Sequence, residues 1–367
     1  MRRYVEDQII ADLKKKMVFL AGPRQAGKTT VALSLLKNSQ QNYLNWDSSE
    51  DRENILKHTW PTLSGLLVLD EIHKYKKWRG LLKGLFDKQR KNLQILVTGS
   101  AKLNYYRRGG DSLQGRYHLI RLNPLSLAEI GDHTQQGLNS LLKYGGFPEP
   151  FLAQSETESR RWSREYRTRV IREDIISLEH VSELSQMEHL MIRLPECVSS
   201  PLSINSLRED LSVSHQTVSR WIRILENLFV IFRIYPFGGP KIRAVKKEAK
   251  HYHFDWTLIQ DPGARFENLV ACHLLKWCHW IEDTQGYDME LRYFKDNEKR
   301  EVDFVILKNR MPIYFIECKL SDNNISTSLR YLARKYPSVK AFQLTLEGKK
   351  DFLNDDGIRV CPAVRFL

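Results

Sequence analysis

The chain has few cysteines and no long apolar run. Five cysteines are scattered among its 367 residues, and no stretch reaches the length of a transmembrane helix. Residues 1–7 are charged and no apolar run follows, so nothing resembles a secretory signal. We therefore expect free thiols in a reducing, cytoplasmic protein with no membrane partner. The pairs Cys272-His273 and Cys278-His279 could suggest zinc, but their spacing fits one helix with two half-buried cysteines better.

Internal repeats and low-complexity segments are also absent, and the composition is that of a folded protein with room for two or three domains. Hydrophobic residues make up 42% and charged residues 28%. The net charge is +13, from 57 basic and 44 acidic residues. This balance favours a polyanionic partner such as nucleic acid, although solvated basic faces are common.

Residues 22–29 read Gly-Pro-Arg-Gln-Ala-Gly-Lys-Thr, which fits the phosphate-loop pattern. An apolar strand over 17–21 precedes the loop and a helix over 30–36 follows it, a context that argues against a chance glycine turn. Backbone N–H groups and the helix N-terminus can hold phosphate there. We expect Mg²⁺ and ATP at this loop, with Lys28 on the β- and γ-phosphates and Thr29 on the metal. The predicted nucleotide-binding residues are Gly22, Pro23, Arg24, Gln25, Ala26, Gly27, Lys28, Thr29 and Thr30.

Residues 65–71 form an apolar run that ends in Asp70-Glu71, the Walker B pattern. Such a run suits a parallel strand buried on both faces, whose carboxyl end meets the nucleotide. Asp70 is predicted to act on the metal, mostly through water, and Glu71 to orient or deprotonate the attacking water. A strand that merely ends in an acidic turn is the alternative, which the phosphate loop at this spacing disfavours.

Two candidate phosphate-sensing residues lie at the end of the next predicted strand, residues 93–100. Thr98 or Ser100 could sense the γ-phosphate, or could equally cap the following helix. Arg116 is a candidate arginine finger for its own or a neighbouring subunit. It could equally be a surface arginine in a basic strip, together with Arg107, Arg108 and Arg121.

Residues 137–195 read as mainly helical, with a glycine/proline turn at 144–150. Six arginines then crowd one segment: Arg160, Arg161, Arg164, Arg167, Arg169 and Arg172. The strip could contact nucleic acid or a phosphate of an adjacent subunit. More often such strips are solvated or paired with local acids.

Residues 203–235 suggest a helix-turn-helix followed by a strand that would form a wing. Ser203 would cap the first helix, and the second would span 215–228. Its exposed start offers side chains that suit DNA: Ser214, His215, Gln216, Thr217 and Arg220. A lid or subunit contact is the alternative role. A basic linker is predicted over residues 238–250, with Lys241, Arg243, Lys246, Lys247 and Lys250.

The last region carries an acid before one apolar strand and acid-x-Lys on the next, as in PD-(D/E)xK nucleases. Residues two apart on a strand face the same side, so Glu317 and Lys319 should point together. We predict that Asp303 and Glu317 bind Mg²⁺, that Glu267 on a helix over 264–277 completes the ligands, and that Lys319 positions water or stabilises charge. A structural ion-pair cluster in a fold that has lost its chemistry is the alternative. Residues 252–256 depart from the strand-and-turn entry expected of such a domain.

Together these motifs resemble those of the bacterial and archaeal AAA-type ATPases that carry a C-terminal domain of long-unassigned function. The matching stretches are residues 22–29, 67–71, 97–100, 115–116 with 124–126, and 145–149. The resemblance implies an α/β protein with a parallel-sheet AAA-type ATPase core, a helical segment, a winged helix and a restriction-endonuclease-like α/β domain. We place these at 1–136, 137–200, 201–240 and 241–367, and the resemblance assigns the nuclease positions to the same four residues.

Two functions follow. In the first, a Mg²⁺-dependent ATPase acts on nucleic acid, DNA in preference to RNA, and its terminal domain cuts the strand. In the second, ATP switches a nucleic-acid or protein binding module whose nuclease-like domain is not catalytic. Either function is compatible with a homo-oligomer. A toxin or defence role is a weaker third reading on which the residues are silent.

Overall fold

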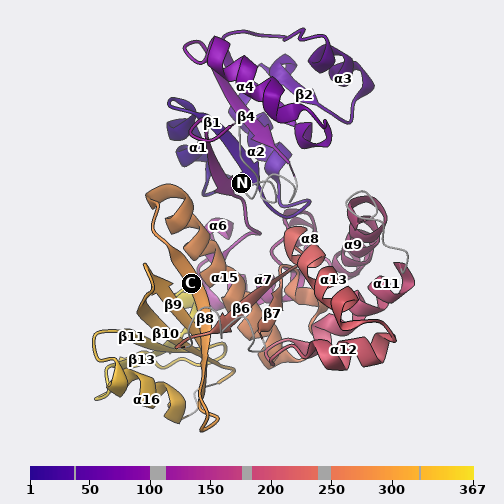
Figure 1. The fold of residues 1–367 in the computed structure, drawn as a ribbon. Coiled ribbons are helices and arrows are strands. Elements are labelled where there is room, and N and C mark those ends of the chain that lie inside the picture. The colour runs from indigo at the N-terminus through magenta and orange to yellow at the C-terminus, as the bar shows by residue number, and fades with distance from the viewer. Residues whose placement is uncertain (37–38, 100–112, 176–183, 239–248, 322–323) are drawn as a thin grey trace. The chain divides into compact units, whose positions relative to one another are not determined.

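The computed structural model describes residues 1–36, 39–99, 113–175, 184–238, 249–321 and 324–367 (Figure 1). The chain divides into two compact units: unit 1 holds residues 1–124 with 227–229, and unit 2 holds 125–226 with 230–367. Several predicted features lie outside the described residues: Ser100, Arg107, Arg108, Lys241, Arg243, Lys246 and Lys247.

Unit 1 is built on a five-stranded sheet in which every pair of neighbours is parallel, in the order β2-β3-β4-β1-β5. Its strands are β1 (Met17–Ala21), β2 (Tyr43–Asn45), β3 (Gly65–Asp70), β4 (Leu93–Thr98) and β5 (Tyr117–Arg121). Its helices are α1 (Glu6–Leu13), α2 (Lys28–Leu36), α3 (Ser49–Leu56) and α4 (Trp78–Gln89). The predicted α/β class with a parallel sheet is confirmed.

The apolar runs at β1 and β3 explain the position of the site. β1 is buried along its whole length, and so are the last four residues of β3, because helices cover the sheet. Asp70 is paired in register with Thr98, and Thr98 with Leu20. Since parallel strands end at one edge, the loop after β1 and the side chains at the ends of β3 and β4 meet there.

The first half of unit 2 is helical, as the sequence predicts for residues 137–195. The helices are α6 (Leu127–Ile130), α7 (Gln135–Tyr144), α8 (Pro148–Ala153), α9 (Glu156–Arg169), a π-helical stretch (Val170–Ile175), α11 (Leu184–Arg193), α12 (Ile204–Leu211) and α13 (His215–Asn227). Trp162 and Tyr166 stack with their ring centroids 5.0 Å apart, and Phe147 packs 4.7 Å from Trp162. This aromatic layer joins α9 to the start of α8.

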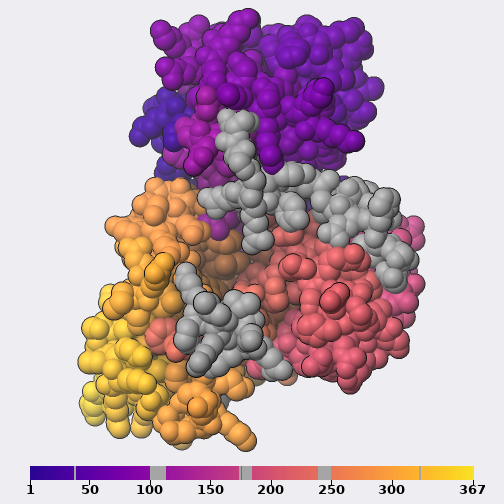
Figure 2. Space-filling model, in the orientation of Figure 1, coloured from indigo at the N-terminus to yellow at the C-terminus, as the bar shows by residue number. Residues whose placement is uncertain are grey.

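The predicted helix-turn-helix is present as α12 and α13, which lie at the surface of unit 2 (Figure 2). Ser203 caps α12 by accepting a hydrogen bond from the Ser206 N–H. Ser212 takes the left-handed conformation (φ 54°) that turns the chain between the helices. The inward face of α13 is strongly apolar, with Val218 and Trp221 fully buried.

The second half of unit 2 is an eight-stranded sheet in the order β12-β13-β11-β10-β9-β8-β6-β7. Its strands are β6 (Ile231–Pro236), β7 (Lys250–His253), β8 (Met289–Lys295), β9 (Glu301–Lys308), β10 (Met311–Lys319), β11 (Lys340–Thr345), β12 (Phe352–Leu353) and β13 (Ile358–Pro362). Its long helices are α15 (Pro262–Gln285) and α16 (Thr327–Lys335).

The strand expected to form the wing is β6. It pairs antiparallel with β7 and parallel with β8, so it belongs to the large sheet. Lys250 was expected in an exposed basic linker, and that prediction is wrong, because Lys250 starts β7 and is 1% exposed. The strand questioned at residues 252–256 is present in part, because Tyr252 and His253 end β7 and the later residues lie beyond it.

Candidate functional site

The phosphate loop packs closely on the chain that follows β5. A Cβ atom on Gly22 would come within 2.2 Å of the Leu122 carbonyl oxygen, so only glycine fits there. Gly27 has φ 95°, a conformation that side chains disfavour. Lys28 is buried at the start of α2, and its Nζ donates to the carbonyl oxygens of Gly22 (3.0 Å) and Pro23 (2.6 Å). The loop therefore has the curl that exposes backbone N–H groups to phosphate.

Asp70 lies at the edge of the sheet and is surrounded by hydroxyl groups. Its Oδ2 accepts hydrogen bonds from Thr29 Oγ1 (2.9 Å) and the Tyr43 hydroxyl (2.7 Å), and its Oδ1 accepts one from Thr98 Oγ1 (2.6 Å). The two predicted Mg²⁺ ligands, Thr29 and Asp70, are thus brought together. Hydroxyl and carboxylate oxygens are the donors that Mg²⁺ takes, so this pair fits the metal.

Tyr43 was not among the predicted site residues. Burial and the neighbouring Asp70 carboxylate raise the pKa of its phenol, so it stays a neutral donor to that carboxylate. Thr98 was predicted to sense phosphate, and the structure gives its hydroxyl a contact with Asp70 instead. The sensor role stays a prediction.

Glu71 follows β3 in the left-handed conformation, with φ 54°. Its backbone N–H donates to the Thr98 carbonyl, and its Oε2 lies 3.5 Å from both His73 Nε2 and Lys74 Nζ. Burial raises the pKa of the Glu71 carboxyl, and the Lys74 ammonium partly offsets that rise. A carboxyl of raised pKa at this edge suits a general base.

Arg116 lies at the amino ends of the parallel strands, directly before β5, whereas the phosphate loop lies at their carboxyl ends. Its carbonyl oxygen accepts from the N–H of Met17, where β1 begins, while the phosphate loop follows the end of β1. Its guanidinium pairs with Asp87 at 2.7 and 3.0 Å. A finger role toward the loop of its own chain therefore does not fit. Action on a neighbouring subunit stays a prediction.

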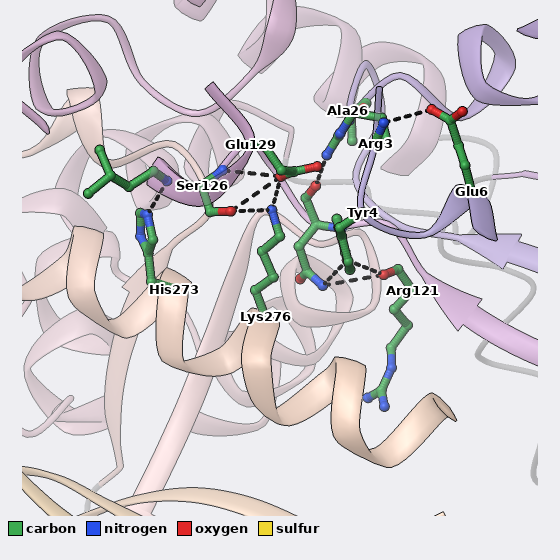
Figure 3. A network of polar contacts seen from close by, with 11 residues as sticks. Arg3, Tyr4, Glu6, Ala26, Arg121, Ser126, Glu129, His273 and Lys276 are labelled. Carbon is green, nitrogen blue, oxygen red and sulfur yellow. Dashed lines mark hydrogen bonds and ion pairs between the residues drawn. The ribbon is translucent and has the colours of Figure 1, made fainter. Parts of the chain in front are cut away.

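Arg3 supports the loop and was missed by the sequence motifs. Its two terminal guanidinium nitrogens, Nη1 and Nη2, donate to the carbonyl oxygens of Ala26 and Asn123, both at 2.6 Å (Figure 3). The hydroxyl of the adjacent Tyr4 donates to the carbonyl of Arg121. Arg3 is 6% exposed, so the clamp is formed out of water. It joins the loop to the end of β5, and no local pattern marks it.

The acidic site of unit 2 forms where β9 and β10 pair. Asp303 Oδ2 accepts from the Cys318 N–H (2.8 Å), and Lys319 Nζ lies 2.8 Å from Glu317 Oε1. The other oxygen, Glu317 Oε2, is buried and has no hydrogen-bond partner in the described part of the chain. The structure thus brings the two predicted metal-binding carboxylates and the predicted lysine together, and the orphaned oxygen fits a cation ligand.

Glu267 joins this site differently from the prediction. Its Oε1 accepts a hydrogen bond from the Tyr252 hydroxyl (2.6 Å) and lies 3.6 Å from Lys250 Nζ. The same Lys250 Nζ lies 2.6 Å from Glu301 Oε1. Burial alone would lower the pKa of Lys250, but the surrounding carboxylates outweigh it and raise it. Within the described ranges, no three acidic, His or Cys side chains converge as metal ligands, so the expected three-carboxylate set is not formed.

Burial also raises the pKa of all three carboxyls of this site, Glu267, Asp303 and Glu317. Glu267 and Glu317 each reach about 7, with the charge of Asp303 adding to the effect of burial. At neutral pH these carboxyls therefore carry less negative charge than carboxyls of ordinary pKa would.

Three of the six arginines of the strip pair with local acids, as the alternative to a binding role predicted. Arg160 pairs with Glu156, Arg161 with Glu158 and Arg169 with Glu165 along α9. At the start of α13, Ser214 and Thr217 bond to each other as a helix cap, which leaves His215 and Gln216 exposed for a partner.

The five cysteines are free. Cys272 lies 3.2 Å from the His253 carbonyl, and His273 Nε2 accepts from the Leu127 N–H, so neither is arranged for zinc.

On the same helix, Lys276 points at Ser126 and Glu129 and contacts both (Figure 3). Across the described residues, no helix combines the length and apolarity needed to span a bilayer.

The class of protein follows from unit 1. A glycine loop between the first strand and its helix, with Thr29 facing an acid at the end of β3, defines a P-loop nucleotide-binding fold. In agreement, residues 14–131 match the family model of the AAA domain, which supports an AAA-type ATPase fold in this region. Residues 135–261 and 262–366 match two domains of unknown function, DUF8612 and DUF4143.

Similar proteins resemble the chain over most of its length. Uncharacterized protein Rv2008c of Mycobacterium tuberculosis is 25% identical, over 90% of this chain and 78% of its own. An uncharacterized protein of Haemophilus influenzae is 23% identical, over 95% and 93%. Uncharacterized protein MJ1544 of Methanocaldococcus jannaschii is 20% identical, over 97% and 86%.

Two solved structures show weak likeness. One is the Aeropyrum pernix ORC1 protein in complex with DNA, at 13% identity and a TM-score of 0.35, covering 74% of this chain and 93% of that one. The other is the STAND protein PH0952 of Pyrococcus horikoshii, at 12% identity and a TM-score of 0.25, covering 77% and 48%. At these TM-scores neither structure informs the function.

Proposed function

We propose that the protein is a Mg²⁺-dependent ATPase that acts on DNA. The contact of Thr29 Oγ1 with Asp70 Oδ2 at 2.9 Å, one residue from Lys28, carries the proposal. Thr29 and Asp70 would hold Mg²⁺, which neutralises phosphate charge when bound. Lys28 would leave the loop carbonyls for the β- and γ-phosphates.

Glu71 would supply the base. Its carboxylate accepts a proton from a water molecule whose oxygen attacks the γ-phosphorus, and the bond from that phosphorus to the bridging oxygen breaks, which releases ADP and phosphate. The buried position and raised pKa of Glu71 support this role.

The nucleic-acid partner is supported by charge and by the surface of α13. The chain carries a net charge of +13, and the exposed His215 and Gln216 begin the second helix of a helix-turn-helix. Such side chains reach bases and phosphates in the major groove.

We further propose that the acidic site of unit 2 cuts the strand with a metal ion. The buried, unpartnered oxygen of Glu317 beside Asp303 supports cation binding, and Lys319 would stabilise developing charge. The alternative is a non-catalytic domain that only binds. It is favoured by Lys250, whose ammonium already sits against Glu267.

Hydrolysis of ATP by full-length protein tests the first proposal. Lys28→Ala should reduce the rate by about a hundredfold or more, because one preorganised donor to developing charge contributes about that much. Lys15→Ala, an exposed lysine at the end of α1, should not change it. Equal rates for wild type and Lys28→Ala would contradict the proposal.

Incubation of DNA with Mg²⁺ or Mn²⁺ separates cutting from binding. Cutting requires products that disappear in Lys319→Ala. A binding module would give nucleotide-dependent affinity, steeply sensitive to salt, without products.

A further inference from the structure

Unit 2 contains a cavity of about 880 Å³ beside the acidic site. This volume is within the range of about 300–1,000 Å³ that ligand pockets occupy. Its walls come from segments far apart in sequence: α9, the turn after α11, the start of α15 and the end of β10. Six charged side chains contribute to its lining: Arg167, Glu196, Asp261, Glu267, Asp303 and Lys319.

Five of these six charged groups already have partners. Glu196 pairs with Arg193, and Asp261 caps α15 by accepting from the Ala264 N–H at 2.7 Å. Glu267, Asp303 and Lys319 take part in the acidic-site contacts described above. The acidic part of the lining is therefore satisfied by the protein itself.

Arg167 differs from the other five. Its side chain is partly buried, and its Nε is out of water without a hydrogen-bond partner. Among the described residues its guanidinium forms no ion pair, although its charge acts on the buried Asp255 and His253. Other arginines of α9 pair with glutamates one turn away. A buried guanidinium N–H without an acceptor is costly, so this site suits an anionic ligand that supplies one.

The position of Lys319 identifies the kind of anion. Lys319 lines the same cavity as Asp303 and Arg167. Guanidinium groups bind phosphate through two parallel hydrogen bonds, whereas an ammonium acts as a point charge. A guanidinium and an ammonium on the same cavity suit a phosphate group, which Arg167 would hydrogen-bond and whose charge Lys319 would neutralise.

We propose that Arg167 and Lys319 hold a phosphate of a nucleic-acid strand in this cavity, next to Asp303. The inference rests on the proposed action of unit 2 on nucleic acid, and it makes the helical segment before α11 part of that site. Arg167 is thus a substrate-binding residue supplied by a region matched only to a domain of unknown function.

Binding of a fluorescent single-stranded DNA oligonucleotide, followed by anisotropy in EDTA, tests the proposal without cutting. Arg167→Ala should weaken affinity about tenfold or more, since a hydrogen bond to a charged group contributes about that factor. The slope of log affinity against log salt should fall by about one. Arg164→Ala, exposed one turn earlier on α9, should leave affinity nearly unchanged.

Arg167→Lys is the second variant, because it retains the charge if Arg167→Ala does not fold. This variant should lose most of the DNA affinity that the bidentate contact provides, and it should unfold at the wild-type temperature. Inorganic phosphate should compete with the oligonucleotide in wild type and compete less in both Arg167 variants. Wild-type affinity in folded Arg167→Lys and Arg167→Ala, or equal losses in Arg164→Ala, would overturn the proposal.

The result is distinguishable from failure of the proposed cutting. If Arg167 contributes to DNA binding but no products form, the phosphate contact is supported and the proposed cutting is contradicted. If metal-dependent cutting occurs and is unchanged in Arg167→Ala, the cutting is supported and the phosphate contact is contradicted.

Discussion

At the edge of the parallel sheet, Asp70 accepts hydrogen bonds from three uncharged hydroxyl groups, whereas in unit 2 Glu267 lies 3.6 Å from the buried ammonium of Lys250. Hydroxyl donors orient a carboxylate and leave its negative charge in place. A buried lysine cancels part of that charge. The first arrangement relies on a cation from solution, and the second carries one within the fold.

The comparison shows that the two acidic sites are built differently. In our proposal, Mg²⁺ enters the site of unit 1 together with a nucleotide. The site in unit 2 must stay folded with several carboxylates close together, and Lys250 makes that tolerable. The predictions below test this difference, starting with the largest expected effect.

Lys250→Met should be the most destabilising of the changes considered. It leaves the buried Glu267 without its ammonium and removes one of the two lysine partners of the half-buried Glu301. Breaking a buried ion pair from one side costs about 3–5 kcal/mol. Chemical denaturation of full-length protein measures the loss. Adding Glu267→Gln should restore part of it, and Lys295→Met, which removes an exposed partner of Glu301, should matter little. Unchanged stability in Lys250→Met would remove the contrast between the sites.

Glu71→Gln should reduce ATP hydrolysis by about a hundredfold or more, because a positioned base contributes about that factor. Affinity for MgATP should be retained, since Thr29, Asp70 and Lys28 are intact. Single-turnover rates and a binding titration separate the two effects. Glu50→Gln, an exposed acid on α3, is the matched control. A normal rate in Glu71→Gln would assign the base elsewhere.

Arg3→Ala should weaken MgATP binding by about tenfold, because it removes the hydrogen bonds to the carbonyls of Ala26 and Asn123 and frees the loop. The neighbouring Arg2 is an exposed control, with a side chain 67% accessible. Titration calorimetry compares the two variants. If Arg3→Ala and Arg2→Ala bind alike, the clamp on the phosphate loop has no role in nucleotide affinity.

Glu317→Gln should raise the melting temperature at pH 8 by a few degrees, about 2–4 °C, and have little effect at pH 4. Burial raises the pKa of Glu317 from 4.5 to about 7, so this carboxyl takes up a proton on folding between those values. The free energy of unfolding therefore falls as the pH rises through that window, and glutamine removes the loss. Melting curves at the two pH values decide it. A gain of equal size at pH 4 would mean that charge is not the cause.

The sequence predicts those parts of the sites that depend on local patterns. The phosphate loop and Asp70 meet because parallel strands end at one edge, and Glu317 and Lys319 point together because strand side chains alternate. Each of these follows from a period or a motif of a few residues.

The remaining parts depend on contacts between distant residues. Arg3 reaches the carbonyl of Asn123, 120 residues away, and no periodicity signals it. Lys250 ends a run of basic residues and reads as solvated, yet carboxylates from α15 and β9 make its burial favourable. Arg116 has the residue type of a finger, but strand pairing sets it at the wrong edge for its own loop. Tertiary structure decides all three.

The central claim is that MgATP binds at the loop of residues 22–29 opposite Asp70. Titration of MgATP into the folded full-length protein, by calorimetry, tests it most directly. We predict a saturable heat with one site per chain that is lost in Lys28→Ala and retained in Lys15→Ala. The absence of heat with wild-type protein, or the same heat with Lys28→Ala, would contradict the claim.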